Sequence, residues 1–123
     1  MKNIILKTDN ISLEAELNDN SVSNGILERV PIASTVSTWG DEIYFTIPQV
    51  RASGAYGTID VESGDVAFWP EGNCLCVFYG RTPASTSEKP VPASEVILVG
   101  KIVKGLDEIS SIKAGDRVTV DVA

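Results

Sequence analysis

Two cysteines separated by a single residue are the clearest candidates for chemistry in this chain. If Cys74 and Cys76 belong to a strand, their side chains point to the same face with Cα atoms about 6.5 Å apart, which disfavours a mutual disulfide. The pair could supply half of a metal site, but the chain has no histidine and no other cysteine, so carboxylates would have to complete it. We interpret both cysteines as small buried apolar side chains, and we predict no metal ion and no cofactor.

The adjacent carboxylates of Asp41 and Glu42 are a second candidate, for acid–base or metal chemistry. Neighbouring side chains in an extended chain point to opposite faces, so this pair is typical of one turn residue and one rim residue. Hydroxyl side chains occur just before them, within residues 34–38. Because the chain has no histidine and no lysine near this segment, the sequence offers no activated nucleophile there.

All eight aromatic residues lie within residues 39–79, which leaves both ends of the chain without any. One interpretation is a barrel core filled from one end by large side chains. The other is an aromatic-lined binding pocket between residues 42–47 and the hairpin of residues 64–80. Trp69 is the strongest single candidate for such a pocket, because it ends a predicted strand just before a Pro-Glu-Gly-Asn turn.

The segment that must position these side chains is residues 64–80, GDVAFWPEGNCLCVFYG. Two apolar runs joined by a turn predict a β-hairpin, and both runs are apolar on both faces. A small antiparallel protein buries both faces of a strand when it closes into a barrel or sandwich that is covered outside. The hairpin is therefore predicted to be central, with a core or covering layer that includes Val66, Phe68, Leu75, Val77, Leu98 and Val120.

The remaining apolar patterns predict further strands and one helix. They comprise a hairpin of residues 2–7 and 11–17, a weak helix within residues 18–30, a hairpin of residues 32–39 and 42–47, strands 94–102 and 117–122, and a short helical segment at residues 106–112. The count predicts a mainly β fold, a closed eight-stranded barrel with one or two peripheral helices, as a single domain of residues 1–123. Residues 48–64 and 80–93 are predicted loops, and residues 80–93 should be the most mobile internal segment.

The composition restricts the classes of partner. Seventeen acidic and ten basic residues give a net charge of −7, which disfavours nucleic acid and anionic membrane surfaces. The N-terminal apolar run is too short for a signal peptide, and no later run approaches the length of a membrane span. We expect a soluble cytoplasmic protein; the oligomeric state stays open, with a monomer slightly favoured.

Three segments together are similar to a known family. GDVAFWPEGNCLCVFYG, the Thr82-Pro83-x-Ser85 pattern that follows it, and WGDEIYFTIP at residues 39–48 resemble the small prokaryotic cyclophilin-like family. This is a minimal and atypical version of the cyclophilin barrel. The resemblance implies a closed eight-stranded barrel with peripheral helices, but no assigned activity for this branch.

Catalytically active cyclophilins are peptidyl-prolyl isomerases, and their motifs can be laid on this chain. Their segment FHRIIPGFMCQGG, placed on residues 43–55, puts the arginine on Phe45, a pocket phenylalanine on Val50 and the glutamine on Ser53. Their GSQFFI strand puts a second pocket phenylalanine on Cys76, and their histidine has no counterpart. A guanidinium near the prolyl nitrogen lowers the barrier to amide rotation, which Phe45 cannot do. Arg51, six residues further on, is the candidate replacement.

Two functions from different classes follow. The first is a binding module whose aromatic pocket takes a small molecule or an extended peptide; the second is a weak or altered prolyl isomerase, in which only Arg51 or Arg81 could supply the cation. The residues expected to bind the ligand are Tyr44, Phe45, Val50, Arg51, Trp69 and Cys76.

Overall fold

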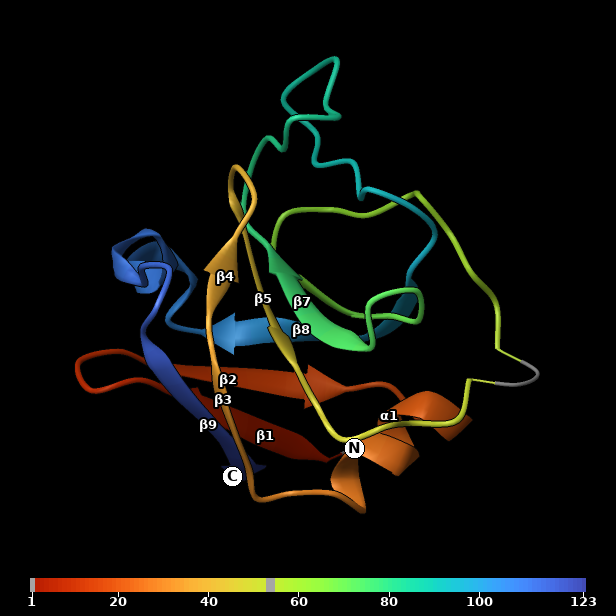
Figure 1. Ribbon diagram of the computed structural model, residues 1–123, viewed down its shortest axis with the longest axis vertical. Coiled ribbons are helices and arrows are strands. Elements are labelled where there is room, and N and C mark those ends of the chain that lie inside the picture. The colour runs from red at the N-terminus through yellow and green to blue at the C-terminus, as the bar shows by residue number, and fades with distance from the viewer. Residues whose placement is uncertain (1, 53–54) are drawn as a thin grey trace.

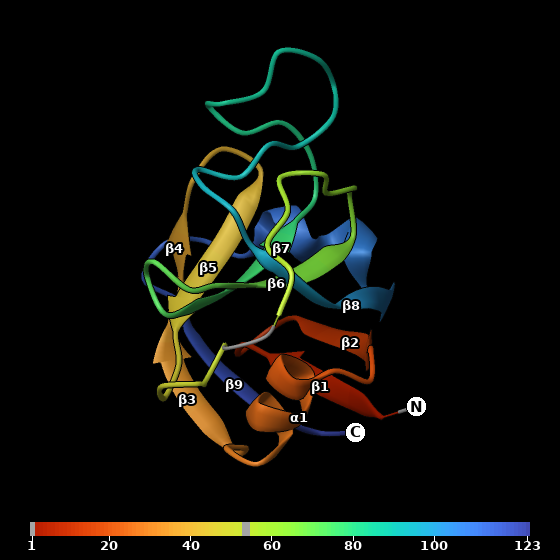
Figure 2. The ribbon, with the colours of Figure 1, turned by 90° about the vertical axis from the view of Figure 1, so that its right-hand side faces the viewer.

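A single curled antiparallel sheet forms the body of the protein (Figures 1 and 2). The computed structural model describes residues 2–52 and 55–123, and within them nine strands and two helices are present. The strands are β1 Asn3–Lys7, β2 Ser12–Leu17, β3 Ile32–Thr35, β4 Ser37–Thr38, β5 Glu42–Thr46, β6 Asp65–Trp69, β7 Cys74–Phe78, β8 Ile97–Lys104 and β9 Arg117–Val122. The helices are α1, Ser21–Leu27, and the 3₁₀ helix η1, Leu106–Ser111.

The sheet closes through one extended segment, residues 32–38. The strand order is β3-β9-β1-β2-β8-β6-β7-β5-β4, so β3 and β4 occupy the two edges of the sheet. Only Val36 separates these two strands in the sequence. One continuous segment therefore pairs with β9 at one end and with β5 at the other, which brings the edges together. Counted as one strand, it gives the eight-stranded barrel that the sequence predicts, and the predicted fold class is confirmed.

The predicted hairpins are present, with one difference. β1 pairs with β2, and β6 pairs with β7 in a register that places Phe68 opposite Leu75. The third hairpin, expected from residues 32–39 and 42–47, is reduced to the short β4 with β5, where Ser37 lies opposite Tyr44. Residues 32–35 pair with β9 instead, because the segment must serve both sheet edges to close the barrel.

The central hairpin is buried on both faces, as its composition predicts. All five residues of β7 are buried, and so are four of the five residues of β6. Inside the barrel the hairpin contributes Val66, Phe68, Leu75 and Val77 to the main core. Its outer face contributes to a second, smaller cluster, which consists of Val61, Ala67, Cys74, Cys76, Phe78 and Val96, with Tyr44, Trp69 and Leu98 packed against it.

In residues 2–52 and 55–123, loop residues and not a helix cover that outer face. Val61 and Val96 belong to the second cluster, and Thr58 forms an isolated antiparallel bridge with Val96. The segments on either side of these residues therefore lie across the outside of β6 and β7. Helix α1 lies elsewhere, at the end of the barrel away from residues 80–93 (Figures 1 and 2).

Helix α1 is shorter than the predicted span of residues 18–30. Asn20 caps it: the Ser23 backbone N–H donates to Asn20 Oδ1 at 2.9 Å, and the Asn20 N–H donates to Ser23 Oγ at 3.0 Å. Val22 and Ile26 are buried and hold the helix on the core, which compensates for its poor helix formers. Neither α1 nor η1 is long and apolar enough to cross a membrane, and these are the helices of the described chain.

Residues 80–93 form a loop that projects from one end of the barrel (Figures 1 and 2). Hydrogen bonds inside the loop hold it together: Thr82 Oγ1 donates to the Val91 carbonyl, and Ser85 Oγ donates to the Lys89 carbonyl at 2.8 Å. Thr82, Pro90 and Pro92 are buried, while residues 86–89 are exposed. The expected mobility of this loop stays a prediction.

Candidate functional site

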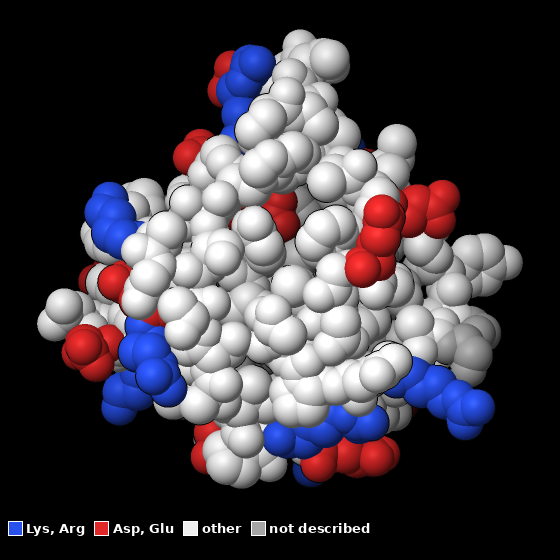
Figure 3. All heavy atoms as spheres, viewed as in Figure 1, with Lys and Arg blue, Asp and Glu red and all other residues white. Residues whose placement is uncertain are grey.

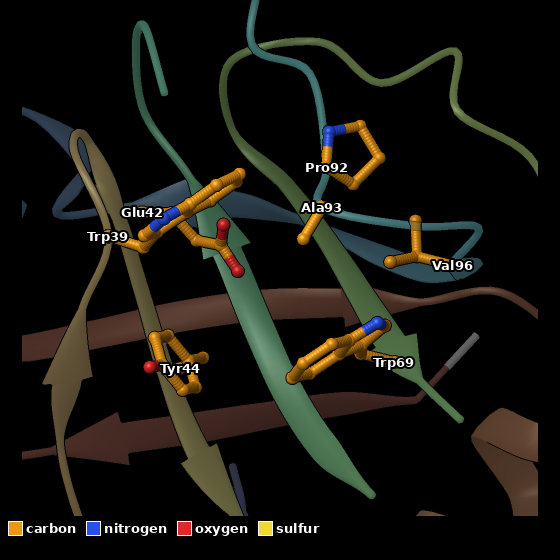
Figure 4. Close-up of a pocket in the computed structure, with 7 residues that line it drawn as sticks. All are labelled: Trp39, Glu42, Tyr44, Trp69, Pro92, Ala93 and Val96. Atoms are coloured by element: carbon orange, nitrogen blue, oxygen red, sulfur yellow. The ribbon is translucent and has the colours of Figure 1, made fainter. Parts of the chain in front are cut away.

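An aromatic pocket lies on the outside of the barrel, over the outer face of the central hairpin and β5 (Figure 4). Its volume is about 120 Å³. The residues that line it are Trp39, Glu42, Tyr44, Trp69, Pro92, Ala93 and Val96. Figure 3 shows this side of the molecule as mostly uncharged, with acidic atoms visible inside a hollow.

Alternation along β5 supplies one wall of the pocket. Glu42 and Tyr44 share the outer face of this strand, whereas Ile43 and Phe45 point into the barrel and belong to the main core. Trp39 comes from the turn before β5, where its backbone N–H donates to the Glu42 carbonyl at 3.0 Å. The local sequence therefore brings an indole, a carboxyl and a phenol to one side.

Trp69 supplies the opposite wall, and its ring is held in place. The indole Nε1–H donates to Ser94 Oγ at 2.7 Å, and the Ser94 hydroxyl in turn donates to Glu71 Oε2 at 2.8 Å. Gly72 packs directly under the ring, since a Cβ built there would lie 2.3 Å from Trp69 Cε3. Gly72, in the turn after β6, and Ser94, in the segment before β8, thus fix the indole from two sides before any ligand arrives.

The rings of Tyr44 and Trp69 meet nearly at right angles. Their centroids are 6.3 Å apart and their planes are inclined by 83°, an edge-to-face arrangement that aromatic pairs favour. In Figure 4 the two rings, together with Trp39, surround the space into which the Glu42 carboxyl points. Three aromatic side chains and one carboxyl therefore face a common volume.

Within the described part of the chain, Glu42 is the one charged side chain in this lining, and it is 6% exposed. Burial raises the pKa of its carboxyl from the ordinary value of 4.5 to about 7, and a hydrogen bond with the Cys76 thiol lowers it by a smaller amount. None of the ion pairs within residues 2–52 and 55–123 includes Glu42. The pocket therefore holds a carboxyl group that changes its charge near neutral pH.

The two cysteines lie behind the pocket and are buried. Burial, with the nearby Glu42 charge, raises the pKa of both thiols, that of Cys76 well above its ordinary value. Both thiols therefore stay protonated at neutral pH and are poor nucleophiles. In the described part of the chain, no group of three or more Cys, Asp or Glu side chains is placed to hold a metal ion.

The turn that carries Trp39 and Glu42 is fixed to the start of the projecting loop. The Asp41 N–H donates to the Arg81 carbonyl at 2.7 Å, and the Tyr79 N–H donates to the Asp41 carbonyl at 2.9 Å. Gly40 has a φ of +59°, and a Cβ there would lie 2.8 Å from the Arg81 carbonyl oxygen. Since the same loop supplies Pro92 and Ala93, a displacement of the loop would change two sides of the pocket.

The structure brings some of the expected ligand-binding residues together and separates others. Tyr44 and Trp69 line the pocket, and Cys76 lies buried in the cluster beneath it. Phe45 and Val50 lie in the main core inside the barrel. Arg51 is exposed and does not belong to the pocket lining.

The positions that correspond to the isomerase motif therefore do not share one pocket. Phe45 and Cys76 lie on opposite faces of the sheet, because Cys76 pairs with Tyr44 and not with its neighbour. Arg81, the second candidate cation, is half exposed and lies 3.6 Å from the Glu88 carboxylate. Ser53 lies outside the described residues.

Sequence reasoning missed part of the lining. The sequence places Trp39 in the aromatic cluster and predicts Glu42 as a turn or rim residue with no ligand role. The i, i+2 spacing of Glu42 and Tyr44 in a strand was a usable signal that they share a face. Pro92, Ala93 and Val96 gave no such signal, because a loop brings them to the pocket through tertiary structure.

A barrel closed in this way, with its central hairpin covered by loops, defines a cyclophilin-type fold. The chain belongs to the cyclophilin-like family, whose model, described as Cyclophilin-like, matches residues 2–121. It is similar to the hypothetical protein AF2241 from Archaeoglobus fulgidus, known from a solution structure, with 31% sequence identity and a TM-score of 0.79. That match covers 99% of this chain and 95% of the archaeal one.

A second solved structure shares the fold alone. It is McbB in complex with tryptophan, which is 17% identical with a TM-score of 0.64. The match covers 96% of this chain but 44% of McbB. No curated protein matches the chain.

Proposed function

We propose that this cyclophilin-like domain is a binding module, whose pocket takes either a small molecule or one side chain of an extended peptide. The observation that carries the proposal is a hollow with aromatic walls that are already fixed, above all Trp69, around one polar group. Ligand pockets are typically preformed and mostly apolar, with few polar groups that orient the ligand. Glu42 is such a group here.

The size of the pocket limits what enters it. A single water needs about 10–15 Å³ of comparable volume, so 120 Å³ accepts a group of several heavy atoms. Pockets for drug-sized ligands have volumes of about 300–1,000 Å³. The ligand is therefore either small or inserts only one of its groups, and the remainder would lie along the mostly uncharged face seen in Figure 3.

The alternative, a weak prolyl isomerase, receives less support from the same geometry. Stabilisation of a twisted prolyl amide calls for a cation aimed at the prolyl nitrogen. Among the residues that the structure describes, the pocket lining contains one carboxyl and no lysine or arginine. Arg51 and Arg81 are both exposed to solvent and lie outside that lining.

The test uses the two tryptophans, which are the only ones in the sequence and both line the pocket. Their indole N–H signals in ¹H–¹⁵N NMR spectra, assigned with Trp39→Phe and Trp69→Phe variants, report on its occupancy. The probes are tert-butanol, tetramethylammonium chloride and an acetyl-Ala-Pro-Ala-amide peptide.

At least one probe should shift both indole signals in a saturable manner. The effect should be lost in a Tyr44→Ala variant and retained in Tyr56→Ala, since Tyr56 is 94% exposed and does not line the pocket. If none of the three probes shifts either signal at millimolar concentration, the pocket is not a binding site and the proposed function is wrong.

A further inference from the structure

We propose that the group bound in this pocket is an organic ammonium cation, held by the Trp39, Tyr44 and Trp69 rings and the Glu42 carboxylate. This inference rests on the proposed binding function and specifies the chemistry of its ligand. It requires two properties of the site: aromatic surfaces within reach of one cation, and an anion with no cation of its own.

The aromatic side chains meet the first requirement. A cation is attracted to the face of an indole or phenol ring when it lies within about 6 Å of the ring centroid. With centroids 6.3 Å apart and planes inclined by 83°, the Tyr44 and Trp69 rings form two sides of a corner. A single ammonium group beside that corner is within reach of both rings. Trp39 closes the space from the β4–β5 turn (Figure 4).

The Glu42 carboxyl meets the second requirement. Its 6% exposure means that it has lost most of its hydration, which is costly for a charged group without compensation. Lys89, Lys101 and Lys104 form ion pairs with carboxylates elsewhere, and the described residues supply no cation to Glu42. A bound ammonium would supply the missing charge, so the pair would stabilise the occupied state in particular.

Charge complementarity disfavours anionic and neutral apolar ligands and favours an organic ammonium cation. A carboxylate or phosphate would be repelled by Glu42 and by the net charge of −7. A neutral apolar group would fill the volume, but it would leave the carboxylate buried and unpaired. An alkylammonium satisfies both the rings and the carboxylate, because it combines an apolar body with a positive charge.

The experiment compares two probes of the same size and tetrahedral shape, tetramethylammonium chloride and tert-butanol. Each is titrated into the intact protein at pH 8 and constant ionic strength, with the indole N–H signals of Trp39 and Trp69 as the readout. We expect the cation to bind at least about tenfold more tightly than the alcohol, since close charge pairs couple by about 1.5 kcal/mol or more.

Glu42→Gln should remove that preference: affinity for tetramethylammonium should fall about tenfold, while affinity for tert-butanol should change little. Asp41→Asn is the matched control. It removes the same charge from the neighbouring residue, whose side chain is exposed and lies outside the pocket lining. It should leave the preference intact, which separates a local contact from the general charge of the protein.

Affinity for the cation should also rise with pH. The groups facing Glu42 are the thiols of Cys74 and Cys76 on β7, the Tyr44 phenol on β5 and the Trp69 indole on β6, and residues 92–96 add no charged side chain to the lining. Glu42 is thus the group that changes charge between pH 5.5 and 8. Because the ionised form should bind about tenfold more tightly than an uncharged side chain, affinity should rise by up to about tenfold from pH 5.5 to 8, and Glu42→Gln should abolish this dependence.

The outcomes are distinct. Equal or tighter binding of tert-butanol, with both indole signals shifted, would overturn the cation inference and leave the binding function standing. Cation binding that Glu42→Gln leaves unchanged would also overturn it. Binding that strengthens at low pH would instead identify protonated Glu42 as a hydrogen-bond donor to a neutral ligand, and it would reject the ammonium assignment.

Discussion

Replacing Glu42 with glutamine should stabilise the protein at alkaline pH. The pKa of the Glu42 carboxyl is raised from 4.5 to about 7 by burial, so the folded state binds a proton over a range in which the unfolded state does not. The stability due to this group is therefore present below about pH 4.5 and is lost as the pH rises through 7. Glutamine is close in shape and does not titrate, so the variant avoids this loss.

The size of the effect follows from the pKa. Each tenfold change in an ionisation constant is worth about 1.4 kcal/mol, so the full difference between 4.5 and 7 corresponds to about 3 kcal/mol. The pocket opens to solvent, which screens part of that cost. We therefore expect the free energy of unfolding of Glu42→Gln, relative to wild type, to increase by about 2–3 kcal/mol between pH 4.5 and pH 8.

Urea denaturation followed by circular dichroism at several pH values measures this difference directly. Wild type and variant share every other titrating group, so subtracting one from the other isolates Glu42. Asp41→Asn serves as the control, and it should change stability by no more than about 0.5 kcal/mol at any pH, because it alters an exposed side chain. A wild-type-to-variant difference that stays constant from pH 4.5 to 8 would refute the reasoning, since it would mean that Glu42 is not desolvated in the folded protein.

Further consequences follow from the core, the pocket and the loop. Phe68→Ala should lower the free energy of unfolding by about 3–5 kcal/mol, because the ring is buried inside the barrel; a denaturation midpoint close to wild type would remove it from the core. Gly72→Ala should displace the Trp69 indole, shift its fluorescence and weaken probe binding, whereas an unchanged emission spectrum would show that the ring is not packed on Gly72. Thr82→Val should speed limited proteolysis within residues 83–89, because it removes the hydrogen bond from Thr82 Oγ1 to the Val91 carbonyl. If wild type and variant are both cleaved first outside residues 83–89, this part of the loop is not mobile. In a protease-coupled assay the protein should show little or no prolyl isomerase activity, and activity that disappears in Arg51→Ala would show that this exposed arginine acts in catalysis after all.

Much of the fold could be predicted because the apolar pattern of its strands is strong. The runs on either side of the Pro-Glu-Gly-Asn turn are apolar on both faces, and the structure buries both faces of β6 and β7. The division of residues 32–38 between the two sheet edges could not be predicted, since it depends on barrel closure and not on local propensity. The sequence predicts a longer helix than α1, because a hydrophobic stripe does not reveal that the Asn20–Ser23 capping box begins the helix only at Ser21.

The pocket was only partly visible in the sequence. The aromatic cluster and the position of Trp69 indicated an aromatic site near the central hairpin, and Tyr44 and Trp69 do line the same hollow. The sequence predicts no ligand role for Glu42, because adjacent carboxylates usually belong to turns and rims. Its significance comes from burial beneath the loop that supplies Pro92 and Ala93, and burial of a polar side chain by a distant loop leaves no periodic signal.

The most direct measurement on the central claim locates a bound probe by intermolecular nuclear Overhauser effects. The twelve equivalent methyl protons of tetramethylammonium give one sharp signal, and contacts from it to ring protons identify the residues that surround it. We predict contacts to the rings of Trp39, Tyr44 and Trp69. In the Glu42→Gln variant these contacts should weaken at the same probe concentration. Contacts confined to exposed aromatic residues such as Tyr56, or saturable binding with no contact to the three pocket rings, would contradict the account.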